Sequence, residues 1–149
     1  MKFQFSRMSW CFVTLLFIVT AICVAQNSED RWRANVELQL ARVSSTLRSA
    51  GLAKTKTWVD SIGQGNQQYI EFRLTAHNSY GFVGVCDQDC SDLDLYLRDD
   101  AGNLIDSDTD SDDHPVVSVT PKYTGDFRLY VRMVRCSNGP CRWAVGAYQ

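Results

Sequence analysis

The sequence has only two histidines, His77 and His114, and both lie in polar stretches. Neither belongs to a Ser-His-Asp or Cys-His arrangement that would activate a nucleophile. Nothing in the sequence places a carboxyl group in an apolar pocket, which acid catalysis of glycoside hydrolysis requires. These shortages indicate that the protein is not an enzyme.

The chain also lacks an apolar run that would span a bilayer comfortably. The run over residues 11–25 has 15 residues, whereas a membrane-spanning helix needs about 20. It follows two basic residues, and the small residues Cys23 and Ala25 occupy the −3 and −1 positions of a cleavage site. These features predict a signal peptide over residues 1–25, with an uncleaved N-terminal anchor as the alternative. We expect a secreted or periplasmic protein with no membrane span after cleavage.

An excess of positive charge is absent as well. Cleavage at the predicted site leaves 124 residues, with 13 Lys and Arg against 17 Asp and Glu, a net charge of −4. A phosphate backbone is bound by a basic surface, so nucleic acid is not an expected partner. The length fits one domain with a modest core.

Four of the six cysteines remain after cleavage, in two closely spaced pairs. An even number in an exported chain predicts disulfides, and we expect Cys86 to pair with Cys90 and Cys136 with Cys141. Loops this small contribute about 2 kcal/mol each. A four-cysteine zinc site is the alternative, although the spacing is looser than in most zinc knuckles.

Residues 26–53 are expected to form an amphipathic helix. Apolar residues recur there at steps of three and four, which places them on one helical face; they are Trp32, Val36, Leu40, Val43 and Leu47. Asn27 or Ser28 can cap the start, and Gly51 can end the helix. The stripe either packs on the rest of the domain or binds a partner or a second copy.

From Lys54 the apolar period changes from helical to alternating. Every second residue is apolar over residues 69–74, 92–98 and 127–133, and Trp143, Val145 and Ala147 form the inward face of a last strand. Turn residues lie at 63–66, 100–103, 122–126 and 137–140. The pattern predicts seven or eight strands over residues 54–149. The fold class is mainly β, an antiparallel β-sandwich preceded by one α-helix.

One stretch of this β region resembles a known family. The acidic strand Asp92-Leu93-Asp94-Leu95-Tyr96-Leu97 is followed by a turn through residues 99–105, a polar loop, and residues 116–120. A Thr124-Gly125-Asp126-Phe127 segment then leads into a long strand. Over residues 54–148 the chain resembles the bacterial pre-peptidase C-terminal domain. The resemblance implies a jelly-roll-like sandwich and a non-catalytic role. Some members of that family bind calcium or extracellular polymers such as collagen, so the resemblance implies that either is a candidate ligand.

An acidic loop over residues 106–113 is a candidate calcium site. Alternate carboxylates can converge on a hard cation, which takes six to eight oxygen ligands. The candidate ligands come from this loop and from the acidic strand; they are Asp92, Asp94, Asp106, Asp108, Asp110 and Asp112. The loop departs from an EF-hand at Ser111 and Val117, so a solvated loop held open by charge repulsion is the alternative.

A second candidate site depends on two strands being neighbours. Outward-facing aromatic and arginine side chains would then share one surface; they are Tyr96, Arg98, Arg128, Tyr130 and Arg132. Such surfaces suit anionic or sugar-bearing partners through stacking and bidentate contacts. The alternative is an ordinary solvated sheet face with cross-strand pairs.

Two functions from different classes follow. The first is a binding module for an extracytoplasmic protein or polysaccharide, acting through the tyrosine and arginine surface. The second is an accessory, chaperone-like or dimerising protein for a secreted enzyme, acting through its N-terminal helix. Calcium is the only cofactor that the sequence indicates.

Overall fold

The computed structural model describes residues 30–149. The predicted signal peptide and the two candidate capping residues of the helix lie outside the described residues. Residues 33–149 form one compact unit. A helix that is described over residues 30–49 precedes eight strands, so the helix ends and the first strand begins close to the expected boundary at residue 54.

Eight strands follow the helix, in agreement with the expected seven or eight. They are β1 (Lys54–Ile62), β2 (Gln67–Leu74), β3 (Tyr80–Cys86), β4 (Cys90–Asp99), β5 (Leu104–Asp108), β6 (Val116–Val119), β7 (Gly125–Cys136) and β8 (Cys141–Tyr148). The turns expected at 63–66, 100–103 and 137–140 separate consecutive strands. The turn expected at 122–126 ends earlier, because β7 already begins at Gly125.

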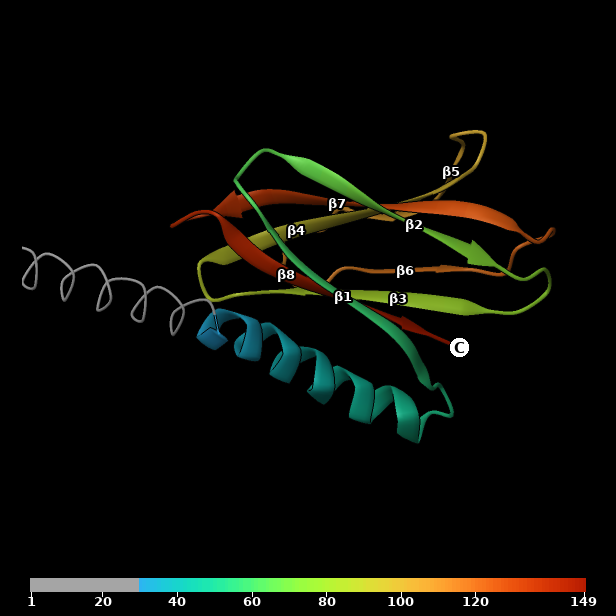
Figure 1. Ribbon diagram of the computed structural model, residues 1–149, viewed down its shortest axis with the longest axis horizontal. Helices are drawn as coiled ribbons and strands as arrows, with labels where there is room; N and C mark the ends of the chain where they lie inside the picture. Colours follow the sequence, from blue (N-terminus) through green and yellow to red (C-terminus); the bar gives the residue numbers. More distant parts are fainter. Residues whose placement is uncertain (1–29) are drawn as a thin grey trace, which may run out of the picture. The chain divides into compact units, whose positions relative to one another are not determined.

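The strands form two antiparallel sheets in the order of a jelly roll. Sheet A has the order β1-β8-β3-β6 and sheet B the order β2-β7-β4-β5. The first strand pairs with the last, the second with the seventh, the third with the sixth and the fourth with the fifth. This is a long hairpin rolled up into two facing sheets, as Figure 1 shows.

The core lies between the two sheets and follows from the alternation in the sequence. Leu93, Leu95 and Leu97 of β4 are buried on the inner face of sheet B, as are the apolar residues of β7. Trp143 and Val145 of β8 meet them from sheet A. Because successive side chains of a strand point to opposite faces, the same alternation leaves polar residues on the outer face of sheet B.

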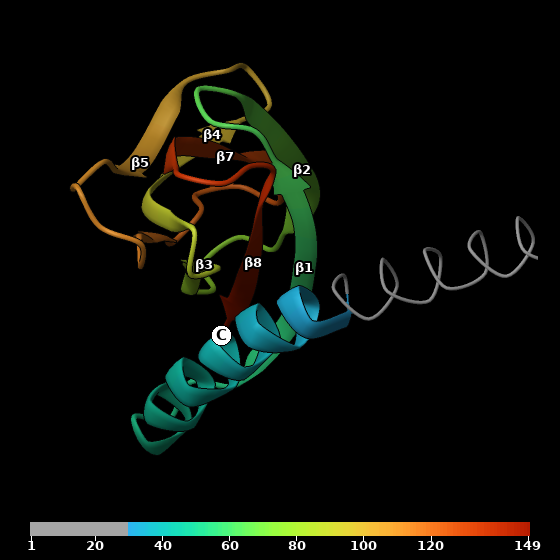
Figure 2. The same ribbon diagram turned by 90° about the vertical axis from the view of Figure 1, so that its left-hand side faces the viewer.

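The helix covers the outer face of sheet A. Val36 and Leu40 are fully buried in a cluster with Val85 of β3 and Ala144 of β8, and Figures 1 and 2 show the helix lying against this sheet. At the far end of the contact Ser44 Oγ and the Tyr148 hydroxyl form a hydrogen bond of 2.8 Å. The central part of the predicted stripe, Val36, Leu40 and Val43, is thus packed on the sandwich.

The helix ends as its sequence predicts, at Gly51. The amide of Gly51 donates to the Arg48 carbonyl and the amide of Leu52 to the Leu47 carbonyl, both at 3.0 Å. Gly51 has a φ of 87°, which a residue with a side chain rarely adopts. The two bonds and the left-handed glycine make a Schellman cap, which turns the chain towards β1.

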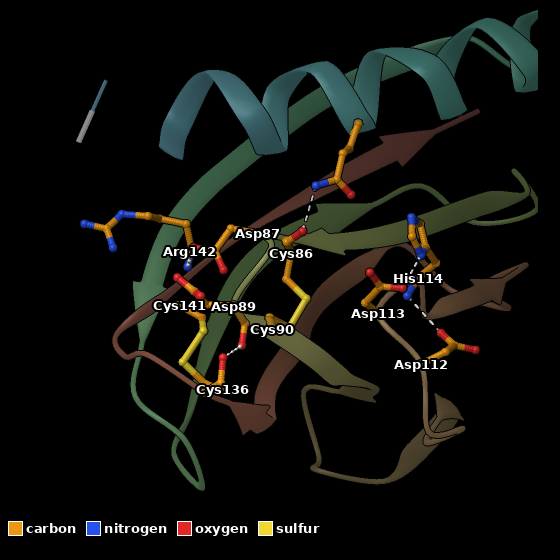
Figure 3. The surroundings of a disulfide bond; sticks show 12 residues. Cys86, Asp87, Asp89, Cys90, Asp112, Asp113, His114, Cys136, Cys141 and Arg142 are labelled. Atoms are coloured by element: carbon orange, nitrogen blue, oxygen red, sulfur yellow. Dashed lines mark hydrogen bonds and ion pairs between the residues drawn. A yellow bond between two sulfur atoms is a disulfide. The ribbon is translucent and has the colours of Figure 1, made fainter. Parts of the chain in front are cut away.

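Both expected disulfides are present, at one end of the sandwich. One joins Cys86 to Cys90 and the other joins Cys136 to Cys141, which leaves no free thiolates for the alternative zinc site. Cys90 of β4 lies opposite Cys136 of β7 in the sheet register, and Figure 3 shows the two bridges next to each other. They constrain the β3–β4 and β7–β8 turns.

Candidate functional site

The outer face of sheet B carries a row of three tyrosines on adjacent strands. Tyr130 of β7 lies opposite Tyr69 of β2 on one side and opposite Tyr96 of β4 on the other. The rings of Tyr69 and Tyr130 are 5.5 Å apart between centroids, in a tilted arrangement. Tyr69 is 57% exposed, so the row presents aromatic surface to solvent.

Arginines flank this row. Arg128 of β7 lies opposite Arg98 of β4, one row along the strands, and Arg132 lies opposite Asp94 on the other side. The neighbouring strands that the second candidate site required are therefore present, and all five of its predicted residues share one face. Whether this face binds a partner stays a prediction. We call the three tyrosines and three arginines the tyrosine face.

Two of the arginines are already held by groups of the chain. Arg128 Nε donates to Glu71 Oε2 at 2.8 Å, and its guanidinium lies 5.7 Å from the centre of the Tyr69 ring. The hydrogen bond to Glu71 raises the pKa of Arg128 further above its usual value. Arg98 Nη1 donates to the Gly102 carbonyl at 2.8 Å. The arginines are thus oriented rather than free to sample many rotamers, and part of their charge is compensated.

Tyr69 and Glu71 were missed by the sequence reasoning on this site. Alternation placed both residues on the outward side of their strand. The sequence did not show that β2 pairs with β7, because sheet neighbours in a jelly roll are far apart along the chain. The register of β2 and β7 is what brings Tyr69 to Tyr130 and Glu71 to Arg128.

Two carboxylates of the acidic strand are buried beside the tyrosine face. Asp94 is 5% exposed, and the Tyr96 hydroxyl donates to its Oδ2 at 2.9 Å. Burial raises the pKa of Asp94; the hydrogen bond from Tyr96 opposes this shift, and the charge of Asp92 adds to it. Asp92 Oδ2 lies 3.7 Å from Arg135 Nε. Both aspartates therefore belong to a local polar cluster on β4.

In the acidic loop, Asp106 and Asp108 accept hydrogen bonds from the other sheet. Asp108 Oδ2 accepts the amide of Val116 at 2.8 Å, and Asp106 Oδ2 accepts the amide of Ser118 at 2.7 Å. Both donors belong to β6, the edge strand of sheet A, whereas the acceptors belong to β5, the edge strand of sheet B. The carboxylates take the place of a further strand and close this side of the sandwich.

The remaining loop carboxylates shape the loop itself. Asp112 Oδ1 accepts the amide of His114 at 2.8 Å, and the amide of Asp110 donates to Asp108 Oδ1 at 3.2 Å. Among residues 30–149 no three Asp, Glu, His or Cys side chains are grouped as metal ligands. A calcium ion would compete with these backbone donors for the same oxygens. Calcium binding by this loop stays a prediction.

The two histidines lie in different surroundings. His114 Nδ1 lies 2.6 Å from Asp113 Oδ1 in an exposed pair, and His77 is in a turn with a φ of 67°. Within the described chain neither imidazole is bonded to a serine or cysteine side chain.

Asp87 is a further buried carboxylate whose burial the sequence did not reveal. Asp87, in the turn between Cys86 and Cys90, is 3% exposed and its Oδ1 has no hydrogen-bond partner within residues 30–149. Burial raises the pKa of this group, as it does for Asp94. The two groups lie in different parts of the fold, one in a turn and the other on a strand. The sequence shows how charges are spaced along the chain, but not how deeply each side chain is buried.

Comparison with known proteins finds similarity in structure but not in sequence. No protein-family model matches the chain, and no curated protein is significantly similar to it in sequence. Among solved structures, it is similar to the pre-peptidase C-terminal domain of a collagenase from Bacillus anthracis, at 16% identity and a TM-score of 0.49; the likeness covers 62% of this chain and 87% of that one. In the described part of the chain, no helix has the length and hydropathy needed to cross a bilayer.

Proposed function

We propose that the chain is an exported, non-catalytic binding module that recognises an extracytoplasmic protein through its tyrosine face. The observation that carries the proposal is the row formed by Tyr69, Tyr130 and Tyr96 on three adjacent strands. Tyrosine combines a large apolar ring with a polar tip and few rotatable bonds. For this reason tyrosine and arginine are enriched among the residues that dominate binding energy at protein interfaces.

The charges of this face favour a mixed partner surface over a strongly anionic one. Arg128 is paired with Glu71, and Arg132 lies opposite Asp94. These pairs reduce the net field that a polyanion would require. A protein surface with its own mixture of apolar and charged groups matches such a face, so binding should depend more on the rings than on ionic strength.

The chemistry of the chain supports export. Two disulfides join pairs of cysteines in the structure, and such bonds persist in oxidising compartments outside the cytoplasm. The predicted signal peptide points to the same compartment. The resemblance to pre-peptidase C-terminal domains supports a non-catalytic role.

The alternative function, docking through the helix, has less support. The buried residues of the helical stripe, Val36 and Leu40, are covered by Val85 and Ala144 of the same chain. A partner could reach them only if the helix left the sheet. No described contact favours that exchange.

Differential capture from the extracytoplasmic fraction of the producing organism tests the proposal. The mature protein, a Tyr96→Ala/Tyr130→Ala variant and a Ser45→Ala/Ser49→Ala variant would be immobilised, and bound proteins quantified by mass spectrometry. Both serines lie on the exposed side of the helix, so the second variant is a matched control. Melting curves would confirm that each variant is folded.

The expected result is a protein that the wild type and the serine variant capture equally and that the tyrosine variant loses. Removing two central tyrosines should weaken binding at least tenfold, because truncation of such residues costs about 2 kcal/mol or more. A partner that is captured equally by all three proteins would contradict the assignment to this face. So would the absence of any partner that distinguishes them.

A further inference from the structure

The two sheets have four edge strands, and three of these edges are protected against pairing with another strand. β1 carries Lys54 and Lys56 on either side of a bulge, and β5 is also bulged where it pairs with β4. β6 has only four residues, and its Val116 and Ser118 amides already donate to carboxylates of β5. Lysines, bulges, short strands and covered edges are the features by which natural sheets avoid edge-to-edge association.

The fourth edge strand, β2, has none of these features. Its eight residues pair with β7 without a register shift. They include no proline, glycine or lysine, and the charges of Glu71 and Arg73 cancel. A short segment that is uncharged overall and has Tyr69, Ile70 and Phe72 at its centre pairs readily with another strand. Figure 2 shows β2 at the margin of sheet B, on the side away from β5.

The backbone of β2 presents one row of hydrogen-bonding groups to which no described strand is paired. The Met133 amide donates to the Asn66 carbonyl at 3.1 Å, just before β2 begins. Because bonding alternates along an antiparallel pair, the even-numbered residues of β2 continue this ladder with β7. The N–H and C=O groups of residues 67, 69, 71 and 73 therefore point away from the sheet. The same alternation holds at Thr75, whose amide donates to the Tyr80 hydroxyl at 3.2 Å.

The side chains along this edge also have unused contacts. The side chains of Glu71 and Arg73 are 51% and 65% exposed on the outer face. Glu71 accepts from Arg128 through Oε2, and Arg73 donates to Asp126 through Nη1. Glu71 Oε1 and the other two guanidinium nitrogens of Arg73 make no hydrogen bond within residues 30–149. On the inner face, the apolar residues of β2 before Leu74 are only half-buried.

We infer that β2 is a dimer interface, at which the β2 strands of two copies pair antiparallel and join their B sheets into one. A twofold axis at Phe72 places Glu71 of each copy opposite Arg73 of the other copy, on the outer face. Opposite charges directly across two strands stabilise the pairing. An axis at Glu71 or at Arg73 would instead place like charges opposite each other. The outward amides and carbonyls of residues 71 and 73 then bond between the copies.

The edge is complementary to itself, which favours a second copy over a strand of another protein. In an interface with twofold symmetry each residue pair occurs twice, so one combination of Glu71 with Arg73 supplies two ion pairs. The dimer does not rest on the protein-binding function proposed above. It would, however, present two tyrosine faces on the same side of one continuous sheet. A partner with two binding segments would engage both faces, which raises its apparent affinity.

Sedimentation equilibrium of the mature protein tests the inference through a pair of charge reversals. Glu71→Arg places arginines opposite each other at both symmetric positions, and Arg73→Glu does the same with glutamates. Each variant should weaken self-association at least tenfold, because two attractive pairs become repulsive. An equimolar mixture of the two variants should recover a dimer, since every one of these pairs then joins opposite charges. Lys54→Glu, on the β1 edge, is the matched control and should dimerise like the wild type.

Amide hydrogen exchange of the wild type gives an independent measurement of the same contact. The amides of Glu71 and Arg73 should be protected at concentrations where the protein is dimeric and should exchange faster on dilution to the monomer. Melting curves would confirm that each charge variant is folded.

Three results would overturn the inference: the wild type stays monomeric up to millimolar concentration, neither charge reversal weakens the dimer, or the two variants do not associate when mixed. These failures are distinct from a failure of the proposed protein-binding function. The Tyr96→Ala/Tyr130→Ala variant should lose the captured partner and remain dimeric. A monomeric wild type that still captures a partner through the tyrosine face would contradict the dimer alone.

Discussion

At the scale of single residues, the aspartates of this chain differ in what surrounds them. Asp87 and Asp94 are buried and have raised pKa values. Asp99 has a pKa below its usual value, mainly because the Asn103 side chain donates to it. Asp106 and Asp108 accept backbone amides of another strand. Aspartate side chains in these different environments therefore contribute differently to stability, and single substitutions can measure each contribution.

The first prediction concerns Asp87. Burial raises the pKa of its carboxyl above the ordinary value of 3.8, so the folded state holds the proton more tightly than the unfolded state. Stability contributed by this group is present at low pH and is lost as pH rises through the interval above 3.8. Asp87→Asn removes the titration and keeps an acceptor for the Arg142 amide.

Relative to wild type, Asp87→Asn should therefore be more stable at about pH 7 than at about pH 3, which means a larger free energy of unfolding of the variant minus that of wild type at the higher pH. Urea denaturation at the two pH values measures this difference. An equal relative stability at both values would show that the buried carboxyl does not titrate as inferred.

The second prediction compares two aspartates of the acidic loop. Asp108→Ala removes the acceptor of the Val116 amide and should cost about 1 kcal/mol, the net value of a typical hydrogen bond. Asp110 is exposed and accepts no described hydrogen bond through its side chain, so Asp110→Ala should stay within about 0.5 kcal/mol of wild type. Chemical denaturation distinguishes them; equal losses would mean that the bridge to β6 does not contribute.

Calcium provides a separate prediction for the same loop. Five carboxylates over residues 106–113 repel one another, and a bound divalent ion would relieve that repulsion. Calcium should then raise the melting temperature relative to chelator, because it binds the native state. An Asp108→Asn/Asp110→Asn variant should reduce the shift. A calcium-induced shift that is the same in this variant would place the ion elsewhere.

At the scale of elements, the helix completes the fold by covering sheet A. The fourth prediction uses two leucines of this helix, which differ in burial. Leu40 is fully buried, whereas Leu38 is 54% exposed. Leu40→Asp places an unpaired charge in an apolar cluster and should cost several kcal/mol or prevent folding. Leu38→Asp should change the free energy of unfolding by no more than about 0.5 kcal/mol.

Thermal unfolding and size-exclusion chromatography of both variants make the test. A Leu40→Asp protein that keeps its melting temperature but changes from dimer to monomer would contradict intramolecular packing. The helix would then be an interaction surface, as the alternative function holds.

The elements themselves were predictable because their patterns are local. Alternation over residues 92–98 and 127–133 identified β4 and β7 and their inward faces. The short cysteine spacings identified both disulfides, and Gly51 identified the helix end. The pairing of β2 with β7 and the bridge from β5 to β6 were not predictable, since both depend on contacts between distant segments.

At the scale of the whole compact unit, the fold determines which surfaces remain open to a partner. The helix covers the outer face of sheet A, and aspartates close the β5–β6 side. The outer face of sheet B remains, and it carries the tyrosine row. The proposed binding face is thus a part of the sandwich that no other described element of the compact unit covers.

Hydroxyl-radical footprinting in the presence of the captured partner tests the central claim, that the tyrosine face is the interface. Oxidation of Tyr69 and Tyr130 would be compared with that of Tyr123, which is 44% exposed and lies outside the tyrosine row. The partner should protect Tyr69 and Tyr130 and leave Tyr123 as reactive as in the free protein. Unchanged oxidation of Tyr69 and Tyr130 at saturating partner would contradict the claim.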